Sequence, residues 1–328
     1  MRELNFGEID GIKVGHCEDL DAATGCTVII CEKGASGGVA IRGGAPGTRE
    51  TDLLNPMEMV QFIHAVVLSG GSAFGLDASG GVMEYLEERG IGFDVGVTKV
   101  PIVCQAVLFD LIIGNHKIRP DKKMGYDACK NSELTCENLQ GNVGAGTGAT
   151  VGKILGPNNS MKGGLGTCAF QIGDLQVGAI VAVNALGDII NPQNGEIIAG
   201  AISDDKYAFL NTEQIMLQQY SEKINRFSGN TTIGLVATNA ILSKAEANKV
   251  ASMSHNGYGR TIKPAHTMYD GDTIFTMATN KVDADINVVG FLATRAIEQA
   301  VINAIKKANT MHGFISYKDL NNIYKNSL

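Results

Sequence analysis

The 328-residue chain contains no tryptophan, and aromatic residues make up only 6% of it. It also lacks any block of lysine and arginine, and its formal net charge at pH 7 is -7. A protein whose main partner is a nucleic acid usually presents a clustered basic surface. The composition therefore argues against nucleic-acid binding as the main role, and it disfavours a negatively charged substrate.

Signals for secretion or membrane insertion are also missing. Residues 1–8 include no apolar stretch of the kind found in a secretion signal, and no segment reaches the roughly 18 to 20 uncharged apolar residues of a membrane span. The cysteines are odd in number, scattered and without a C-x-x-C pair, which favours reduced, buried thiols over disulfides or a zinc site. We therefore expect a cytoplasmic protein with no metal ion and no membrane partner. The cysteines are Cys17, Cys26, Cys31, Cys104, Cys129, Cys136 and Cys168.

Glycine, by contrast, is abundant: 41 of the 328 residues are glycine, well above the roughly 7% of an average protein. This abundance implies many tight turns and close backbone approaches. The segment 43–51 is a glycine-rich loop that permits such an approach. The segment 141–153 is denser still, but a Walker loop would need a glycine in place of Thr147 and a Ser or Thr in place of Ile154. A dinucleotide fingerprint would need a strand before it, and residues 133–140 are mostly polar. We therefore expect no bound cofactor.

The apolar runs and the turn residues together predict an α/β chain. Strands are expected at residues 25–31, 39–42, 91–109 with a break at Pro101, 163–171, 176–188, 231–239 and 273–278. Helices are expected at residues 55–63, 72–88, 242–254 and 288–308. Other expectations are a turn at 34–38, the end of a helix at 255–259, irregular structure at 114–142 and a mobile surface segment at 203–229.

The segment 228–239 joins a polar, charged region to an abrupt apolar run. Gly229 and Asn230 can adopt unusual backbone angles, and the hydroxyl residue Thr231 then opens a β-branched run typical of a strand. This pattern suits an N-terminal nucleophile: the Thr231 hydroxyl attacks the carbonyl carbon of Asn230, the peptide becomes an ester, and water cuts the chain. The freed α-amine, with a reference pKa of roughly 7.7 to 8.0, then serves as the base. The same tetrapeptide is also typical of an ordinary turn that leads into a buried strand.

Three segments taken together resemble one family. They are Gly-Asn-Thr-Thr-Ile-Gly-Leu-Val-Ala-Thr-Asn at 229–239, His-Thr-Met-Tyr-Asp-Gly-Asp-Thr at 266–273, and the glycine loop at 144–153. From about residue 11 to about residue 307, the chain resembles the DmpA-type self-processing hydrolases, peptidase family S58. Within that family it is most similar to the hydrolases that cut nylon (6-aminohexanoate) oligomers.

The resemblance implies a four-layer α/β/β/α sandwich, an α/β fold also found in ornithine acetyltransferase, in a single hydrolase domain that spans residues 1–328. It also implies autocleavage between Asn230 and Thr231. The large chain (1–230) and the small chain (231–328) would stay associated as a heterodimer, commonly within a tetramer. The substrate would be a small-molecule amide or a peptide.

The resemblance further implies helpers for the Thr231 nucleophile. Lys153 would place a positive charge near the new α-amine, which favours the neutral form of that amine. Asn184 would donate a hydrogen bond to the oxyanion, a contribution that can reach roughly 3 to 4 kcal/mol. Asp270 and Asp272, two apart on an extended segment, would orient the hydroxyl and the ammonium of Thr231. From the residues alone, Lys153 could also be a surface charge, and Asp270-Gly271-Asp272 could be only a hairpin turn.

The chain departs from the aminopeptidase branch of this family. It resembles that branch at residues 100–103, but it reads Cys-Gln-Ala-Val-Leu-Phe at 104–109, without the tyrosine that helps to bind the oxyanion there. It also has Asp270 and Asp272 in place of a serine and a glutamate. We therefore expect a hydrolase of linear amides or peptides, such as 6-aminohexanoate oligomers. The alternatives are an aminopeptidase/D-esterase of the same family, an N-acyltransferase of the ornithine acetyltransferase type and a non-enzymatic binding protein.

Overall fold

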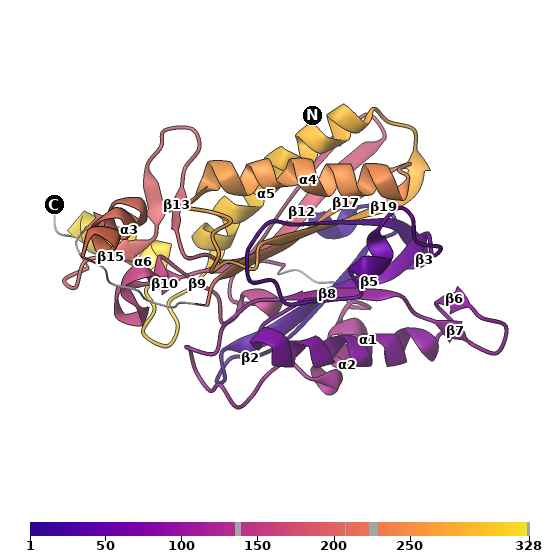
Figure 1. Cartoon of the computed structure of the whole chain (residues 1–328), viewed down its shortest axis with the longest axis horizontal. Helices are drawn as coiled ribbons and strands as arrows, with labels where there is room; N and C mark the ends of the chain where they lie inside the picture. The colour runs from indigo at the N-terminus through magenta and orange to yellow at the C-terminus, as the bar shows by residue number, and fades with distance from the viewer. Residues whose placement is uncertain (135–138, 207, 223–228, 327–328) are drawn as a thin grey trace.

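The computed structural model describes residues 1–134, 139–206, 208–222 and 229–326 (Figure 1). Ten of the described strands form one sheet, in the order β1-β11-β12-β17-β19-β3-β5-β8-β4, with β2 also paired to β3. These strands are Arg2–Leu4 (β1), Lys13–Asp19 (β2), Thr24–Ile41 (β3), Thr48–Arg49 (β4), Phe62–Ser69 (β5), Val103–Val107 (β8), Gly164–Ile172 (β11), Leu175–Asn184 (β12), Thr231–Ala240 (β17) and Thr273–Val282 (β19).

Short strands and helices complete the chain. The short strands are Phe93–Asp94 (β6), Lys99–Val100 (β7), Thr150–Val151 (β9), Met161–Lys162 (β10), Asp188–Ile190 (β13), Ile197–Ala199 (β14), Ala201–Ile202 (β15), Phe209–Leu210 (β16) and Ile262–Lys263 (β18). The α-helices are Ala78–Glu87 (α1), Lys122–Asn131 (α2), Thr212–Ser221 (α3), Lys244–Thr261 (α4), Ile286–Lys307 (α5) and Tyr317–Asn326 (α6).

The long strand β3 joins two halves of the sheet that face each other. Its first part pairs with β2 and β5, and its second part pairs with β19. One apolar core contains side chains from both halves, so the two halves pack face to face. Its members include Ile180, Leu235 and Phe275 from one half and Ile29, Val66 and Ala106 from the other.

Helices cover the two outer faces of this sandwich. Side chains of α4 and α5 share a second core with β12 and β17, and side chains of α1 and α2 share a third core with β3 and β5. Figure 1 shows α4 and α5 above the strands and α1 and α2 below them. The layers are therefore helix, sheet, sheet and helix, which confirms the predicted α/β/β/α sandwich.

Helix α5 lies beside α4 in one outer layer, at the place predicted for residues 288–308. Among the described helices it is the one that is long and apolar enough to cross a membrane, but 67% of its apolar stretch is buried inside the protein. Its buried side chains pack on β11 and β12. The apolar surface of α5 is therefore explained by the core. The strands predicted at 163–171, 176–188 and 273–278 are confirmed as β11, β12 and β19.

Helix α4 runs farther than the sequence indicated. A capping box of Ser243 and Glu246 begins it, because the side chain of each residue accepts a hydrogen bond from the backbone N–H of the other. The prediction that residues 255–259 would end the helix is wrong. Gly257 lies inside it, where a Cβ would come within 2.6 Å of Ile297 on α5. This glycine therefore permits close helix packing and does not terminate the helix.

Two other predicted elements are wrong. Residues 55–63 form turns and not a helix, because the Asn55 side chain accepts the Met57 N–H and Phe62 already belongs to β5. The turn predicted at 34–38 lies inside β3, where only the register against β5 shifts. At 34–38, pairing with β5 and β19 overrides the local preference for a turn.

Helices also occur in a segment predicted to be irregular and in a segment predicted to be mobile. The region 114–142 contains α2, which begins where the Asp121 side chain accepts the Met124 N–H. The predicted mobile segment at 203–229 contains α3, capped in the same way by Asn211. The remainder of that prediction, at 207 and 223–228, lies outside the described residues. So does Cys136, whereas the other six cysteines are free thiols.

Candidate active site

Thr231 is the first residue of β17, a strand that is buried over its whole length. This strand lies between β12, to which it is antiparallel, and β19, to which it is parallel. The register places Thr231 opposite Asn184, the last residue of β12. Only 5% of Thr231 is exposed, so the candidate nucleophile lies at the end of a central strand.

The peptide bond before Thr231 has two hydrogen-bond donors beside it. In the uncut chain that the structure describes, the Thr231 hydroxyl donates to the carbonyl oxygen of Asn230. The backbone N–H of Gly271 donates to the same oxygen over 3.1 Å. A Cβ at position 271 would lie 2.7 Å from Thr231 Oγ1, so glycine leaves the room that the hydroxyl needs. The hydroxyl thus lies against the bond that it would attack, and the carbonyl oxygen already has a backbone donor.

Lys153 is buried next to this peptide bond, with 2% of its surface exposed, so the alternative of a surface charge is wrong. Its Nζ donates to the Gly229 carbonyl oxygen at 3.2 Å and to the backbone and side-chain oxygens of Asn184 at 2.9 and 2.8 Å. Burial lowers the pKa of Lys153 to about 7, and the charges of Asp270 and Asp110 oppose that shift. Lys153 can therefore exchange a proton near neutral pH, close to the candidate nucleophile.

Asn184 is held by hydrogen bonds at both ends of its side chain. Its Oδ1 accepts from Lys153 Nζ and from the Thr150 N–H, the latter at 3.0 Å. Its Nδ2 donates to the carbonyl oxygen of Phe109 at 2.9 Å. The amide that the family resemblance suggested as an oxyanion donor is thus bonded to Phe109, and the backbone N–H of Gly271 donates to the carbonyl before the candidate nucleophile.

Asp270 and Asp272 lie on the segment that leads into β19. The strand before this segment, β18, pairs with β13 and not with β19, so the alternative of a hairpin turn is wrong. The Asp270 carboxylate accepts from the N–H and the hydroxyl of Thr267, at 2.8 and 2.7 Å. Burial, followed by the neighbouring charge of Asp272, raises the pKa of Asp270 to about 6. Asp272 Oδ1 accepts the Thr232 N–H at 2.8 Å, so this carboxylate holds the residue after the candidate nucleophile.

The glycine-rich loop at 43–51 packs on this aspartate segment. The N–H of Ala45 donates to the carbonyl of Asp270 at 2.8 Å, and the N–H of Gly43 donates to the carbonyl of Asp272 at 3.3 Å. The close approach that the glycines permit is therefore an approach to the backbone of the candidate site.

The structure also brings residues to the site that sequence reasoning missed. His266 bonds to Asp272 through both its backbone N–H and its ring, and the signal was its place at the head of the 266–273 motif. Phe109 lies against Gly229, where a Cβ would come within 2.5 Å of the ring. Asp110 is buried, and burial raises its pKa. Nothing beyond their position at the end of an apolar run pointed to Phe109 and Asp110.

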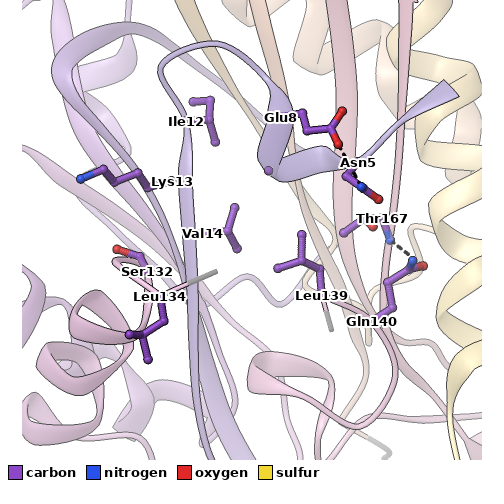
Figure 2. A pocket seen from close by; sticks show the side chains of 11 residues that line it. Asn5, Glu8, Ile12, Lys13, Val14, Ser132, Leu134, Leu139, Gln140 and Thr167 are labelled. Atoms are coloured by element: carbon purple, nitrogen blue, oxygen red, sulfur yellow. Dashed lines mark hydrogen bonds between the residues drawn. The ribbon is translucent and has the colours of Figure 1, made fainter. Parts of the chain in front are cut away.

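A separate pocket of about 550 Å³ lies away from these residues. Figure 2 shows it between β2, which carries Lys13 and Val14, and the N-terminal segment, which carries Asn5 and Glu8. None of the candidate site residues lines it. Over the described part of the chain, no group of three or more His, Cys, Asp or Glu side chains is placed to hold a metal ion.

Solved structures with a similar fold are known. The L-aminopeptidase D-Ala-esterase/amidase of Ochrobactrum anthropi, a variant of the Ntn-hydrolase fold, matches with a TM-score of 0.70 at 17% identity, over 97% of this chain and 93% of that one. A β-aminopeptidase of a Burkholderia species matches with a TM-score of 0.68, also at 17% identity, over 97% and 92% of the two chains. These likenesses confirm the fold.

Relatives with higher sequence identity cover nearly the whole chain. An uncharacterized aminopeptidase of Mycobacterium tuberculosis is 38% identical, over 95% of this chain and 96% of its own. The 6-aminohexanoate-oligomer endohydrolase of a Kocuria species is 29% identical, over 93% of this chain and 87% of its own. Residues 6–318 match peptidase family S58, as the motifs suggested. The chain therefore belongs to peptidase family S58.

Proposed function

We propose that this chain cuts itself between Asn230 and Thr231 and then uses Thr231 as an N-terminal nucleophile against amide bonds. Membership of a peptidase family makes it a hydrolase of such bonds. The observation that carries the self-processing proposal is the carbonyl oxygen of Asn230, which accepts from both the Thr231 hydroxyl and the Gly271 N–H. The Gly271 N–H continues the parallel pairing of β17 with β19, whereas the Thr231 hydroxyl at the same oxygen belongs to no strand pairing.

Self-cleavage would proceed by an N-to-O acyl shift. The Thr231 oxygen loses its proton and bonds to the carbonyl carbon of Asn230, whose oxygen becomes an oxyanion bound by the Gly271 N–H. The C–N bond then breaks, the Thr231 nitrogen takes a proton to become an amine, and an ester remains. Water hydrolyses this ester, which releases the Asn230 carboxyl group and restores the Thr231 hydroxyl.

The same residues would then serve substrate amides. The free α-amine of Thr231 accepts the hydroxyl proton, since its reference pKa of roughly 7.7 to 8.0 leaves a useful neutral fraction. A protonated Lys153 beside it would favour that neutral form. Asn184, opposite Thr231 on β12, would donate its amide to the substrate oxyanion. Asp270 and Asp272 would orient the amine and the hydroxyl.

We also propose that the two cleaved chains, 1–230 and 231–328, stay together as a heterodimer. The small chain would supply β17 and β19, which pair with β12 and β3 of the large chain, and α5, which packs on β11 and β12. Separation would expose two apolar cores to water. A tetramer of such heterodimers follows from the family resemblance, and native mass spectrometry would measure it.

Linear amides, 6-aminohexanoate oligomers among them, are the proposed substrates. The aspartate pair at Asp270 and Asp272 favours the nylon-oligomer branch, and a 29% identical relative is named for that activity. The alternative of an aminopeptidase/D-esterase is supported by the 38% identical mycobacterial aminopeptidase. The alternative of an N-acyltransferase predicts that the acyl group passes to ornithine in place of water.

Mass spectrometry and Edman sequencing of the purified protein test the proposal. We expect two chains, the smaller beginning Thr-Thr-Ile-Gly, and we expect Thr231→Ala to give an uncut, folded, inactive protein. An intact wild-type chain that is nevertheless active would contradict the proposal, as would cleavage of Thr231→Ala at the same bond. Assays with the linear 6-aminohexanoate trimer and with L-alanine p-nitroanilide, with and without ornithine, distinguish the three activities.

A further inference from the structure

His266 lies outside the predicted site and contacts it directly. Its backbone N–H and its ring Nδ1 both bond to Oδ2 of Asp272, at 3.0 and 2.8 Å. The other carboxylate oxygen of Asp272 accepts the Thr232 N–H at 2.8 Å. Thr232 follows the proposed nucleophile in β17, so one carboxylate links the imidazole to the start of that strand.

We propose that His266 is a positioning residue for self-cleavage and for substrate turnover. Its imidazole fixes the Asp272 carboxylate, and the carboxylate fixes the backbone at Thr232, so that the Thr231 hydroxyl faces the carbon that it attacks. The inference rests on the proposed function, because it concerns the same nucleophile. His266 acts through Asp272 and exchanges no proton with the substrate.

The surroundings of the ring favour one orientation. Because a carboxylate only accepts hydrogen bonds, Nδ1 of His266 carries the hydrogen in its bond to Asp272. The rest of the ring lies against His255 and Tyr258, whose rings are 4.9 and 6.2 Å away between centroids. Burial lowers the pKa of His255 to about 4 and raises that of Tyr258, so both rings are neutral near pH 7. The imidazole is thus held between one carboxylate and two uncharged rings.

The backbone at His266 lies in the left-handed region, with φ at 60°. Histidine is enriched in this region relative to most residues, and glycine and asparagine also adopt it readily. The side chain is therefore compatible with this backbone, and the contact it makes is the bond from Nδ1 to Asp272.

Two substitutions at this position separate the side chain from the backbone. His266→Gly keeps the left-handed backbone and the N–H bond to Asp272 but removes the ring. His266→Asn also tolerates this backbone, and it places an amide N–H near the position of Nδ1. His312→Gly is the matched control, because His312 also has a positive φ, 49°, but is exposed and bonds to the carbonyl oxygen of Leu20.

The rate of precursor decay on gels is the first readout, and it needs no substrate. The second is kcat and KM of the matured enzyme with the 6-aminohexanoate trimer and L-alanine p-nitroanilide. His266→Gly should slow decay and lower kcat by about 10²-fold while KM changes less than about 3-fold, because misplaced groups impair attack more than binding. His266→Asn should restore both rates to within about 5-fold of wild type. His312→Gly should match wild type.

Wild-type rates in His266→Gly would overturn the inference, and so would rates in His266→Asn as low as those of the glycine variant. An equal loss in His312→Gly would also overturn it, since a general effect of loop stiffness would then explain the result. A wild-type protein that neither matures nor hydrolyses either probe would instead overturn the proposed function, so the two failures can be told apart.

Discussion

Lys153 and Lys162 share their local properties but have different neighbours. Both are buried, and burial lowers the pKa of each to about 7. Each directs its Nζ at three oxygens. Lys162 donates to the carbonyl oxygens of Gly146, Ala149 and Gly163, at 3.1, 2.8 and 3.0 Å.

The difference lies in what those oxygens belong to. All three oxygens of Lys162 are backbone carbonyls of the glycine-rich region 146–163, so this lysine fastens a loop. Lys153 bonds to the backbone carbonyls of Asn184 and Gly229 and also to the Asn184 side-chain oxygen, and the charge of Asp270 acts on it. A depressed pKa therefore reports burial in both cases. Only the neighbours indicate whether the proton is used in chemistry.

The largest contrast is expected between Lys153→Met and Lys162→Met. Methionine keeps much of the apolar volume but supplies neither charge nor donor. Lys153→Met should slow precursor decay and turnover by about 10³-fold or more, because it removes a charge and also releases Asn184, and one donor alone can be worth about 10²- to 10³-fold. Lys162→Met should change both rates less than about 10-fold. Gel densitometry measures the rate of precursor decay, and the two amide assays measure turnover. Equal losses in the two variants would show that Lys153, like Lys162, has only a structural role.

Asn184→Ala tests the neighbour that Lys153 has and Lys162 lacks. Turnover should fall by about 10²- to 10³-fold if the Asn184 amide binds the substrate oxyanion. Self-cleavage should fall less, by about 10-fold, because the Gly271 N–H already donates to the Asn230 carbonyl in the uncut chain. Precursor decay and assays of the matured fraction give the two rates. Normal values for both would show that Asn184 is merely the end of a strand.

Sequence reasoning succeeded for elements whose apolar runs are long. The strand at Thr231–Ala240 and the helix at Ile286–Lys307 are both buried against other layers, so their apolar composition already predicts that they lie in the core. It failed for Lys122–Asn131, a polar helix whose signal was the single cap Asp121. It also failed at 55–63, where the Asn55 side chain forms a turn with the Met57 N–H and the strand β5 begins at Phe62.

Sequence reasoning could predict only part of the candidate site, for a similar reason. Lys153, Asn184, Thr231 and the aspartates come from separate segments, and their grouping came from the family resemblance, because spacing alone cannot show that distant segments meet. The donor at the Asn230 carbonyl is the backbone N–H of Gly271, which has no side-chain signature. His266 gained a role only once the fold showed its ring against a carboxylate.

A smaller effect, on stability, is expected from Lys162→Met. The substitution leaves three buried carbonyl oxygens without their donor, so the free energy of unfolding should fall by about 2 to 3 kcal/mol at pH 7. Urea unfolding should be measured in a Thr231→Ala background, in which one uncut chain unfolds and a two-state analysis applies. An unchanged midpoint would show that the loop does not depend on this lysine.

The smallest expected effect is the pH dependence of the stability loss caused by Lys162→Met. In this property the two lysines should behave alike. The pKa of Lys162 is about 7 in the folded protein and near 10.5 in the unfolded chain, so between these values the unfolded chain binds a proton that the folded protein does not. The contribution of Lys162 to stability should therefore rise with pH across this window, and the loss caused by Lys162→Met should grow by about 1 kcal/mol per pH unit from pH 7 to 8.5. Below about pH 6 the loss should be constant. Lys153→Met should show the same slope, because both lysines owe their low pKa to burial, whereas a flat difference would show that the folded protein keeps these lysines charged.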